Sequence, residues 1–402
     1  MVSDYAANSR RPQPRGSGSR PVDGHGPLEI HFNTRLTRGS TRFVKSMKEL
    51  ELGLDTFGDV TRSADGTSDS QAQVIRNVVR EAVLADQLGV DFIGLGEHHR
   101  PDFAISSPEI VLAAIAGQTS RIKLGTSVTV LSSDDPVRVF ERFSTLNAIS
   151  SGRAEIILGR GSFTESFPLF GYSLDDYETL FEERLELFAA LLEKDRKGEP
   201  VTWRGTTRAP LVNQRVFPST ERALTTWVGV GGSPESVVRA ARYGMRLMLA
   251  IIGGNPRRFL PYVDLYRHSL AELGHAELPI GVHSPGFVAE TDEKARETVW
   301  PAYREMRNRI GAERGWGPTS RAEFESEIER GSMYLGSPDV VASKIAATVN
   351  ALGLSRFQLK YSSGPLPQEA MMRSIELYSR EVIPRVRELV TRSGPKSAFQ
   401  TA

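Results

Sequence analysis

The sequence predicts an α/β fold, specifically a (β/α)8 TIM barrel with insertions. Short apolar runs alternate with amphipathic stretches along most of the chain, and the runs are too continuous for strands that expose one face to water. Eight such runs, each followed by a helical stretch, favour a closed barrel of parallel strands. An open, doubly wound sheet is the alternative, because alternation alone does not show that a sheet closes.

The eight predicted strands are short, apolar and bounded by turn residues. In chain order they are LELGLDTF from Leu50, DFIGLG from Asp91, RIKLGTSVTVL from Arg121, RAEIILGRG from Arg153, TTWVGVGG from Thr225, MRLMLAII from Met245, LPIGVHSPGFVA from Leu278 and RFQLKY from Arg356. Between them lie stretches whose apolar residues have the spacing of one helix face. The clearest are QAQVIRNVVREAVLADQLG from Gln71, PVRVFERFSTLNAIS from Pro136, YETLFEERLELFAALLEK from Tyr177 and PESVVRAARYG from Pro234.

Two segments interrupt this alternation. Residues 202–217 contain WRGTTRAPLVNQRVF, which predicts a small hairpin. Residues 310–334 form a long polar connection that contains GAERGWGPTS. Long connections in compact barrels cover a site or stay mobile, so we interpret this one as a lid over the barrel mouth, with a plain insertion as the alternative.

Residues 1–46 are rich in Arg, Pro, Gly and Ser and lack apolar periodicity, which is typical of a flexible extension. Residues 47–402 are then one barrel domain, and we hypothesise that the native chain starts at Met47. Arg10 and Arg11 resemble a twin-arginine signal, but no apolar segment follows them. No run reaches the roughly 20 apolar residues of a membrane helix. We therefore expect a cytoplasmic protein that does not bind membranes.

The composition favours chemistry on a small molecule. With 50 basic and 49 acidic side chains, the formal net charge is +1, which argues against a nucleic-acid-binding protein. The absence of cysteine excludes disulfides, thiolate nucleophiles and cysteine-bound metal centres.

The segment GLGEHHRPDFAISSPE, from Gly94, places Glu97, His98 and His99 directly after a predicted strand. The carboxyl ends of barrel strands carry the chemistry in this architecture. Histidine changes charge near neutral pH, so the triplet can supply an acid–base group, an anion partner or a metal ligand. A hydrogen-bonded structural histidine is the plain alternative.

A metal site at this triplet would use Glu97 and His99, on one side of an extended strand, together with a third ligand from elsewhere. His268, His275 and His283 do not form ligand-spaced pairs. We therefore predict no metal.

The segment GVGGSPES joins a predicted strand to a predicted helix. Gly231 and Gly232 let a ligand approach the backbone closely, and Ser233 suits the helix N-cap. Free N–H groups at a helix N-terminus bind anions, so a phosphate fits here. An ordinary helix start, with Glu235 facing the helix dipole, is the alternative. The segment LGSPD, from Leu335, repeats the pattern without the double glycine, and we assign it to capping.

In ILGRGSFTESFPLFGY, Arg160 directly follows a predicted strand. A guanidinium group binds phosphate through two hydrogen bonds, while Gly161, Ser162 and Thr164 leave room for the phosphate oxygens and the phenylalanines supply an apolar wall. An ion pair between Arg160 and a nearby glutamate is the alternative. Barrel topology brings the strand exits to one mouth, and these exits are marked by His98, Thr126, Arg160 and Gly231.

Five blocks, in this order, resemble the bacterial luciferase-like family of flavin-dependent monooxygenases. They are GLGEHH, then IKLGTSVTVLSSDDPVRVFERFSTLNAISSGRAEIILGRG, then FPLFGY, then the strand–GGSPES–helix unit followed by RAARYG, and finally LGSPDVVASKI. The resemblance extends from about Leu50 to about Val390. Glu-His-His alone is unspecific, but together with the second block at this spacing it is characteristic of the family.

The resemblance implies a (β/α)8 barrel that binds reduced FMN, or the related deazaflavin coenzyme, at its mouth. It implies that His98 lies beside the reactive face of the flavin as an acid–base group, and we assign catalysis to His98 and Glu97. Position and resemblance together assign the cofactor to Thr126, Ser127, Arg160, Gly161, Ser162, Gly231, Gly232, Ser233 and Ser236.

Two further points follow from the resemblance. Many family members carry a non-proline cis peptide at the third-strand exit, where this chain has Thr126, Ser127 and Val128. Gly232 stands where luciferase itself has an acidic residue, so light emission is not implied.

We therefore expect a monooxygenase that oxidises a small organic substrate with dioxygen and reduced FMN, the latter supplied by a separate flavin reductase. FMN is preferred because Glu-His-His belongs mostly to the FMN branch of the family. A deazaflavin-dependent dehydrogenase or reductase on the same fold, and a flavin-binding protein without turnover, are the alternatives. The resemblance also implies a homodimer or larger homo-oligomer. The loop from Arg100 to Ser107 and the connection over residues 310–334 are expected to shape the substrate pocket.

Overall fold

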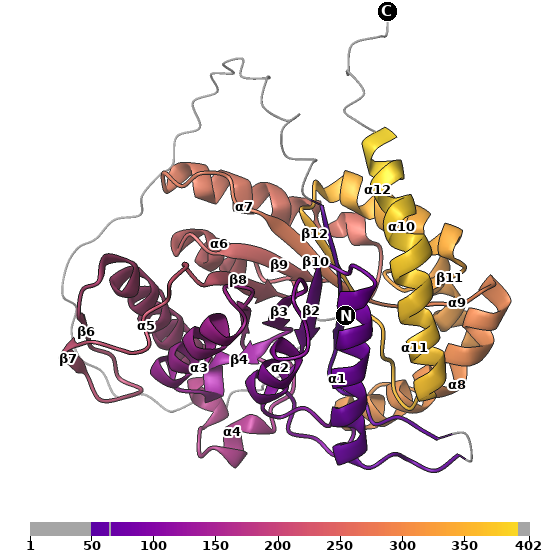
Figure 1. The fold of residues 1–402 in the computed structure, drawn as a ribbon, viewed down its shortest axis with the longest axis horizontal. Helices are drawn as coiled ribbons and strands as arrows, with labels where there is room; N and C mark the ends of the chain where they lie inside the picture. The colour runs from indigo at the N-terminus through magenta and orange to yellow at the C-terminus, as the bar shows by residue number, and fades with distance from the viewer. Residues whose placement is uncertain (1–49, 64–65, 393–402) are drawn as a thin grey trace, which may run out of the picture.

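The structure is a computed structural model that describes residues 50–63 and 66–392. The extension predicted over residues 1–46 and the start proposed at Met47 lie outside the described residues. Strands gather at the centre of the molecule and helices surround them (Figure 1). In the described part of the chain, no helix is both long and apolar enough to cross a membrane.

The central sheet is a barrel of parallel strands. Its strands are β1 (Glu51–Thr56), β2 (Phe92–Leu95), β3 (Lys123–Thr126), β4 (Thr129–Val130), β5 (Glu155–Gly159), β8 (Thr225–Val230), β9 (Arg246–Ala250), β10 (Ile280–Val288) and β12 (Arg356–Lys360). Hydrogen-bonded neighbours follow the order β3-β2-β1-β12-β10-β9-β8-β5-β4, nine strands in one row. Leu124 of β3 also pairs with Ala154, directly before β5, so the two ends of the row meet. The predicted barrel is confirmed, and the open-sheet alternative is wrong.

All eight predicted runs form strands of this barrel. The run from Arg121 gives both β3 and β4, which are separated only by Ser127 and Val128. Helices follow the strands as predicted: α1 (Gln71–Gln87), α2 (Pro108–Ala116), α3 (Pro136–Ile149), α5 (Tyr177–Lys197), α6 (Pro234–Arg242), α7 (Leu260–Glu272), α10 (Pro338–Leu352), α11 (Gln368–Leu377) and α12 (Ile383–Arg392). Ser337 begins α10 without a side-chain capping hydrogen bond, whereas Asp135 caps α3 by accepting from the Val137 amide at 2.8 Å.

Apolar side chains fill two separate regions of the barrel. The larger cluster lies between the strands and the surrounding helices. The smaller one lies inside the barrel and consists of Phe92, Ile157, Trp227 and Met248, with Val128 packed against it. Below this inner layer, the buried guanidinium group of Arg356 pairs with Glu51 and Glu155. A filled interior leaves the ends of the strands as the place for a site.

The hairpin predicted within residues 202–217 is confirmed, because β6 (Val201–Trp203) and β7 (Leu211–Gln214) pair antiparallel. The polar connection predicted over residues 310–334 is wrong in detail. Helix α8 (Asp292–Arg314) continues into it, α9 (Arg321–Glu329) follows, and β11 (Tyr334–Gly336) pairs with β10. A reciprocal capping box between Ser320 and Glu323 starts α9. These helices bury only a few residues each, so their periodicity is weak in the sequence.

Candidate active site

The chain leaves β2 through Gly96, and only glycine fits at this position. A Cβ atom there would lie 2.2 Å from the Phe57 ring and 2.9 Å from the carbonyl oxygen of Ser127. The next amide, that of Glu97, donates to the carbonyl oxygen of Val128 at 3.2 Å. The exits of β1, β2 and β3 therefore pack directly against one another at the barrel mouth.

Three phenylalanine rings enclose the imidazole of His98. The ring centroids lie 4.5 Å from Phe57, 4.6 Å from Phe103 and 5.1 Å from Phe163. Burial in this apolar setting is the main cause that lowers the pKa of His98 to about 3. The imidazole is therefore neutral near pH 7, with one nitrogen as a donor and the other as an acceptor.

Glu97 and His99 hold each other and the neighbouring strand. Oε2 of Glu97 accepts from the Val130 amide at 2.9 Å, and Oε1 lies 3.0 Å from Nε2 of His99. The Glu97 side chain is buried, and His99 packs edge-on against Phe170 at 5.0 Å. Glu97 thus ties the β2 exit to β4, which is the geometry of a positioning residue.

The third-strand exit carries the expected cis peptide, between Ser127 and Val128. The fully buried Thr126 donates from Oγ1 to the Ile157 carbonyl at 3.2 Å. The Ser127 hydroxyl donates to Oε1 of Gln358 at 3.0 Å. The hydroxyl groups of Thr126 and Ser127, both predicted to bind the cofactor, therefore have protein partners inside the barrel.

Charged residues gather at the rim beside β5 and α6. Arg160 pairs with Glu178 at the start of α5, as the ion-pair alternative predicts. The same carboxylate lies 3.6 Å from Arg239 of α6, and Arg239 donates to the hydroxyl of Ser236 at 3.3 Å. The predicted residues Arg160 and Ser236 are thus joined through Glu178 and Arg239. Arg239 was not predicted, although its position one helical turn after Ser236 could have indicated it.

The N-terminus of α6 follows Gly231 and Gly232 directly. Gly232 has φ of +127°, a conformation that other residues rarely adopt. Ser233 caps the helix by accepting from the Ser236 amide at 3.3 Å, and its hydroxyl donates to Glu235 at 2.7 Å. The Ser233 hydrogen bond, with two nearby guanidinium charges, lowers the pKa of Glu235. Glu235 therefore lies at the helix N-terminus, in agreement with the plain capping alternative.

The loop after β5 closes over the aromatic cluster. Gly161 has φ of +79°, and the exposed Ser162 accepts from Arg314 of α8 on its carbonyl oxygen at 3.1 Å. Phe163 carries a guanidinium group against its ring from each of two arginines, Arg100 at 4.7 Å and Arg314 at 4.8 Å. The ring that touches His98 is thereby fixed by two other segments of the mouth.

Arg100 connects the loop after β2 with the end of α8. It pairs with Asp102 at 3.1 Å, with Glu165, and with Glu313 at 2.5 Å. Asp102 in turn pairs with Arg309 of α8 at 3.1 Å. The end of α8, which forms the first residues of the predicted lid, therefore contacts the loops that enclose His98.

Three polar residues inside the barrel escaped prediction. Oδ2 of Asp55 on β1 lies 2.8 Å from Nδ1 of His283 on β10, and Gln358 of β12 pairs with His283 in strand register. Oδ1 of Asp55 and Nε2 of Gln358 are buried and have no hydrogen-bond partner in the described residues. The available signal was a polar residue within an apolar run, as in LELGLDTF, since such residues are costly to bury without a role.

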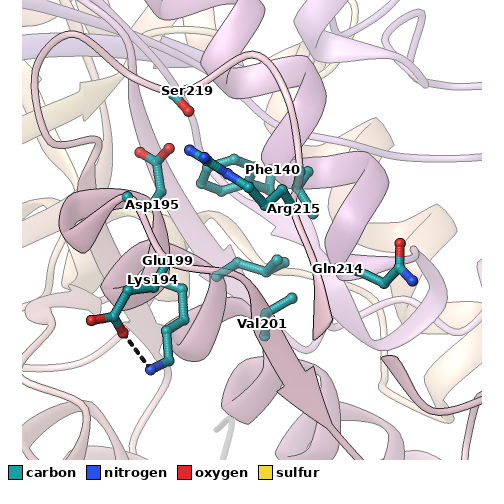
Figure 2. Close-up of a pocket in the computed structure, with 11 residues that line it drawn as sticks. Phe140, Lys194, Asp195, Glu199, Val201, Gln214, Arg215 and Ser219 are labelled. Carbon is teal, nitrogen blue, oxygen red and sulfur yellow. Dashed lines mark hydrogen bonds and ion pairs between the residues drawn. The ribbon is translucent and has the colours of Figure 1, made fainter. Parts of the chain in front are cut away.

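Away from the barrel mouth, the described residues provide a small hollow but no candidate metal site. Across residues 50–63 and 66–392, His, Asp and Glu form no group of three or more that could hold a metal ion. A small hollow beside the β6–β7 hairpin is lined by Phe140, Asp195, Gln214 and Arg215, among others (Figure 2). No predicted site residue lines it, so it is separate from the barrel mouth.

Comparison with known proteins agrees with this geometry. Residues 56–356 match the family model described as luciferase-like monooxygenase. The 4-hydroxyprotoasukamycin monooxygenase of Streptomyces nodosus subsp. asukaensis is 31% identical over 320 residues, which cover 75% of this chain and 84% of that protein.

Solved structures give the same picture of the fold. Monooxygenase RslO1 from Streptomyces bottropensis has a TM-score of 0.72 and 26% identity, covering 83% of this chain and 99% of its own. The oxygenating constituent of 3,6-diketocamphane monooxygenase from Pseudomonas putida, in complex with FMN, has a TM-score of 0.68 and 21% identity, covering 84% of this chain and 98% of its own. The coenzyme F420-dependent tetrahydromethanopterin reductase from Methanopyrus kandleri has a TM-score of 0.63 and 18% identity, covering 84% of this chain and 99% of its own.

Proposed function

The chain belongs to the luciferase-like monooxygenase family and is a flavin-dependent oxidoreductase, and from that membership we propose that it uses reduced FMN and dioxygen to oxidise a small organic substrate. The observation that carries the proposal is one mouth with two contrasting ends. His98 sits in a cage of phenylalanine rings, and Arg160 lies on the rim beside the N-terminus of α6. An apolar end and a cationic end suit a cofactor with a flat ring and a phosphate.

The chemistry of the rim residues fits an FMN phosphate. Arg160 and Arg239 supply guanidinium groups, Ser233 supplies a hydroxyl, and the first turn of α6 supplies N–H groups. Glu178 pairs with Arg160 and lies 3.6 Å from Arg239, and Glu182 pairs with Arg239 more closely, so a phosphate must compete with two carboxylates. Gly161, Ser162, Gly231 and Gly232 form the backbone around this end and belong to the proposed site.

The proposed work of the chain lies in binding, orientation and exclusion of water. When bound, reduced FMN supplies the electrons that activate dioxygen. His98, neutral in its apolar cage, offers a hydrogen-bond donor and an acceptor at the reactive face. Glu97 positions His99 and β4, and the phenylalanine rings keep water away from the reacting atoms. Thr126 and Ser127 support the third-strand exit from within the barrel.

A deazaflavin-dependent dehydrogenase or reductase is the second candidate, because a coenzyme F420-dependent reductase shares the fold. The two candidates differ in their use of oxygen. Membership in a monooxygenase family leaves a flavin-binding protein without turnover unsupported.

Isotope labelling tests the proposed reaction. The purified chain is mixed with photoreduced FMN, ¹⁸O-labelled dioxygen and a panel of small aldehydes, ketones and phenols, and mass spectrometry follows the label. Incorporation of one labelled atom into a product is expected. Hydride transfer from reduced deazaflavin to any member of a matching panel without oxygen, and no labelled product with FMN, would establish the second candidate instead.

The proposal includes a flavin reductase as partner, a homodimer or larger homo-oligomer, and a cytoplasmic location. Sedimentation velocity on the full chain tests the assembly, and a species with the mass of one chain at micromolar concentration would refute it.

A further inference from the structure

A carboxylate–imidazole pair lies inside the barrel, and the proposed function gives it no task. Oδ2 of Asp55 lies 2.8 Å from Nδ1 of His283, and their relative exposures are 0% and 6%. A carboxylate in this position accepts the Nδ1 proton and fixes the tautomer whose Nε2 is free to accept a proton. The pair therefore has the arrangement of an oriented general base.

The groups around this pair have unused hydrogen-bonding capacity. In the described part of the chain, Nδ1 of His283 is hydrogen-bonded to Asp55, and Nε2 has no hydrogen bond. Nε2 also retains some solvent exposure, since it is absent from the fully buried atoms that lack a partner. Oδ1 of Asp55 and Nε2 of Gln358 are fully buried and also lack partners there. Each unpaired buried polar group costs about 1–3 kcal/mol, and such groups recur where a ligand or water completes them.

The pair borders the same mouth as His98. The Phe57 ring is stacked on His283 at 6.0 Å and meets His98 edge-on at 4.5 Å, so both imidazoles contact the same ring. Gly94 packs closely against the pair, because a Cβ atom there would lie 2.7 Å from the Ser127 hydroxyl and 3.1 Å from Cβ of Asp55. The polar pair and the aromatic cage therefore both adjoin Phe57.

We propose, building on the proposed function, that the substrate carries an acidic hydroxyl group, as a phenol or enol does, and that His283 takes the proton of this hydroxyl. The O–H bond breaks and its electron pair stays on oxygen, while an N–H bond forms at Nε2. Asp55 offsets the charge of the resulting imidazolium, and the unpartnered Nε2 of Gln358 donates to the oxyanion.

The charged groups nearby are compatible with an oxyanion. Asp55 faces His283 from β1, and Lys360 of β12 lies 4.5 Å above the Phe57 ring. Lys360 pairs with the buried Asp59 at 3.0 Å, and His98 lies beyond Phe57 as a neutral group. Within the described residues, the charge of Asp59 acts on His98, but no carboxylate hydrogen-bonds to its imidazole, so His283 is the better-oriented base.

The probe 4-nitrophenol tests this inference, because its neutral and ionised forms have separate absorption bands. The full chain, with and without saturating FMN, is titrated with the probe at a pH at which the free probe is mostly neutral. The wild type is expected to raise the ratio of ionised to neutral bound probe roughly tenfold, which corresponds to one pKa unit. His283→Gln and Asp55→Asn are expected to bind the probe and to lose this increase, while His268→Ala, an exposed histidine on α7, keeps it.

Three outcomes overturn the inference: no probe binding by the wild type, equal ionisation in His283→Gln, or loss of ionisation in His98→Gln alone. Asp55→Asn guards against misfolding, because it keeps the shape of the side chain. FMN binding, followed separately by flavin fluorescence, tests the proposed function. A chain that binds FMN and leaves the probe neutral loses only this inference, and a chain that ionises the probe without binding FMN loses only the proposed function.

Discussion

At the scale of single residues, surroundings change what a side chain can do. The Glu-His-His triplet permits an acid–base group, an anion partner or a metal ligand, and the sequence does not separate these uses. Phenylalanine rings around His98 keep its imidazole neutral, while Glu97 spends both oxygens on Val130 and His99. The three neighbours therefore differ in chemistry although they are adjacent in the chain.

The low pKa of His98 predicts a contribution to acid sensitivity. The pKa falls from 6.5 to about 3 on folding, so between these values the unfolded chain binds a proton that the folded chain does not. Stability therefore decreases as the pH is lowered through this range. His98→Gln is expected to reduce the loss of unfolding free energy between about pH 7 and about pH 4 by about 2–3 kcal/mol.

Urea denaturation at the two pH values measures this difference. His268→Gln, which alters an exposed histidine, serves as the control and should behave as the wild type does. An identical loss in His98→Gln and the wild type would show that His98 is protonated normally in the folded chain.

We expect substitutions of Glu97 to lower the stability of the fold by an amount that depends on which atoms are removed. Glu97→Ala leaves the Val130 amide without its acceptor, which costs about 1–3 kcal/mol. Glu97→Gln retains an oxygen that can accept from this amide, so a smaller loss is expected. Thermal unfolding of the two variants provides the comparison, and equal stability of Glu97→Ala and the wild type would contradict the positioning role.

At the scale of secondary-structure elements, α5 and α6 meet at the cationic rim through Glu178. This carboxylate pairs with Arg160 and lies 3.6 Å from Arg239, which also pairs with Glu182, so it competes with any phosphate there. Glu178→Gln is therefore expected to strengthen FMN binding by about 3–10-fold, and Arg160→Ala to weaken it by about 10–100-fold.

Isothermal titration with FMN measures both changes, at moderate salt because the groups are partly exposed. Glu193→Gln removes an equivalent charge from the same helix at its pair with Lys197, and it should leave the affinity unchanged. Weaker binding by Glu178→Gln would place the phosphate elsewhere.

Elements with a continuous apolar pattern were predictable from the sequence, and elements without one were not. The barrel strands are buried on both faces, so each gives an uninterrupted apolar run. Helix α8 buries few of its residues and contains Pro301, so its last turns and α9 were predicted as an irregular connection. The triplet at 97–99 and Arg160 were found because they follow strands directly. Asp55 and His283 come together only through the pairing of β1, β12 and β10, which no local motif records.

At the scale of the whole molecule, the barrel has a charged floor and an aromatic mouth. Arg356 is fully buried between Phe92 and Trp227, and its guanidinium group bonds Glu51 and Glu155. Burial alone would raise the pKa of Glu155, but the charge and hydrogen bond of Arg356, the charge of Lys123 and the hydrogen bond from Trp227 together lower this pKa to about 2. The floor is thus one network that joins β1, β5 and β12.

We expect Arg356→Met to lower the free energy of unfolding of the whole barrel. It leaves the Glu155 carboxylate buried without its main partner, which costs about 3–5 kcal/mol at neutral pH. Arg387→Met, which removes a partly exposed pair with Asp91, should cost only about 0–1 kcal/mol. Chemical denaturation of both variants provides the measurement, and similar losses would mean that the floor network does not stabilise the barrel.

The proposed reaction and the assigned site both require a flavin to bind at the mouth that His98 and Arg160 share. Fluorescence titration of the purified chain with FMN, alongside the deazaflavin coenzyme, tests this claim most directly. We expect saturable quenching of FMN fluorescence, weaker binding of the deazaflavin, and loss of FMN affinity in Arg160→Ala. Two results would contradict flavin binding at this mouth. One is unchanged FMN fluorescence across the titration, and the other is full FMN affinity in both Arg160→Ala and His98→Gln.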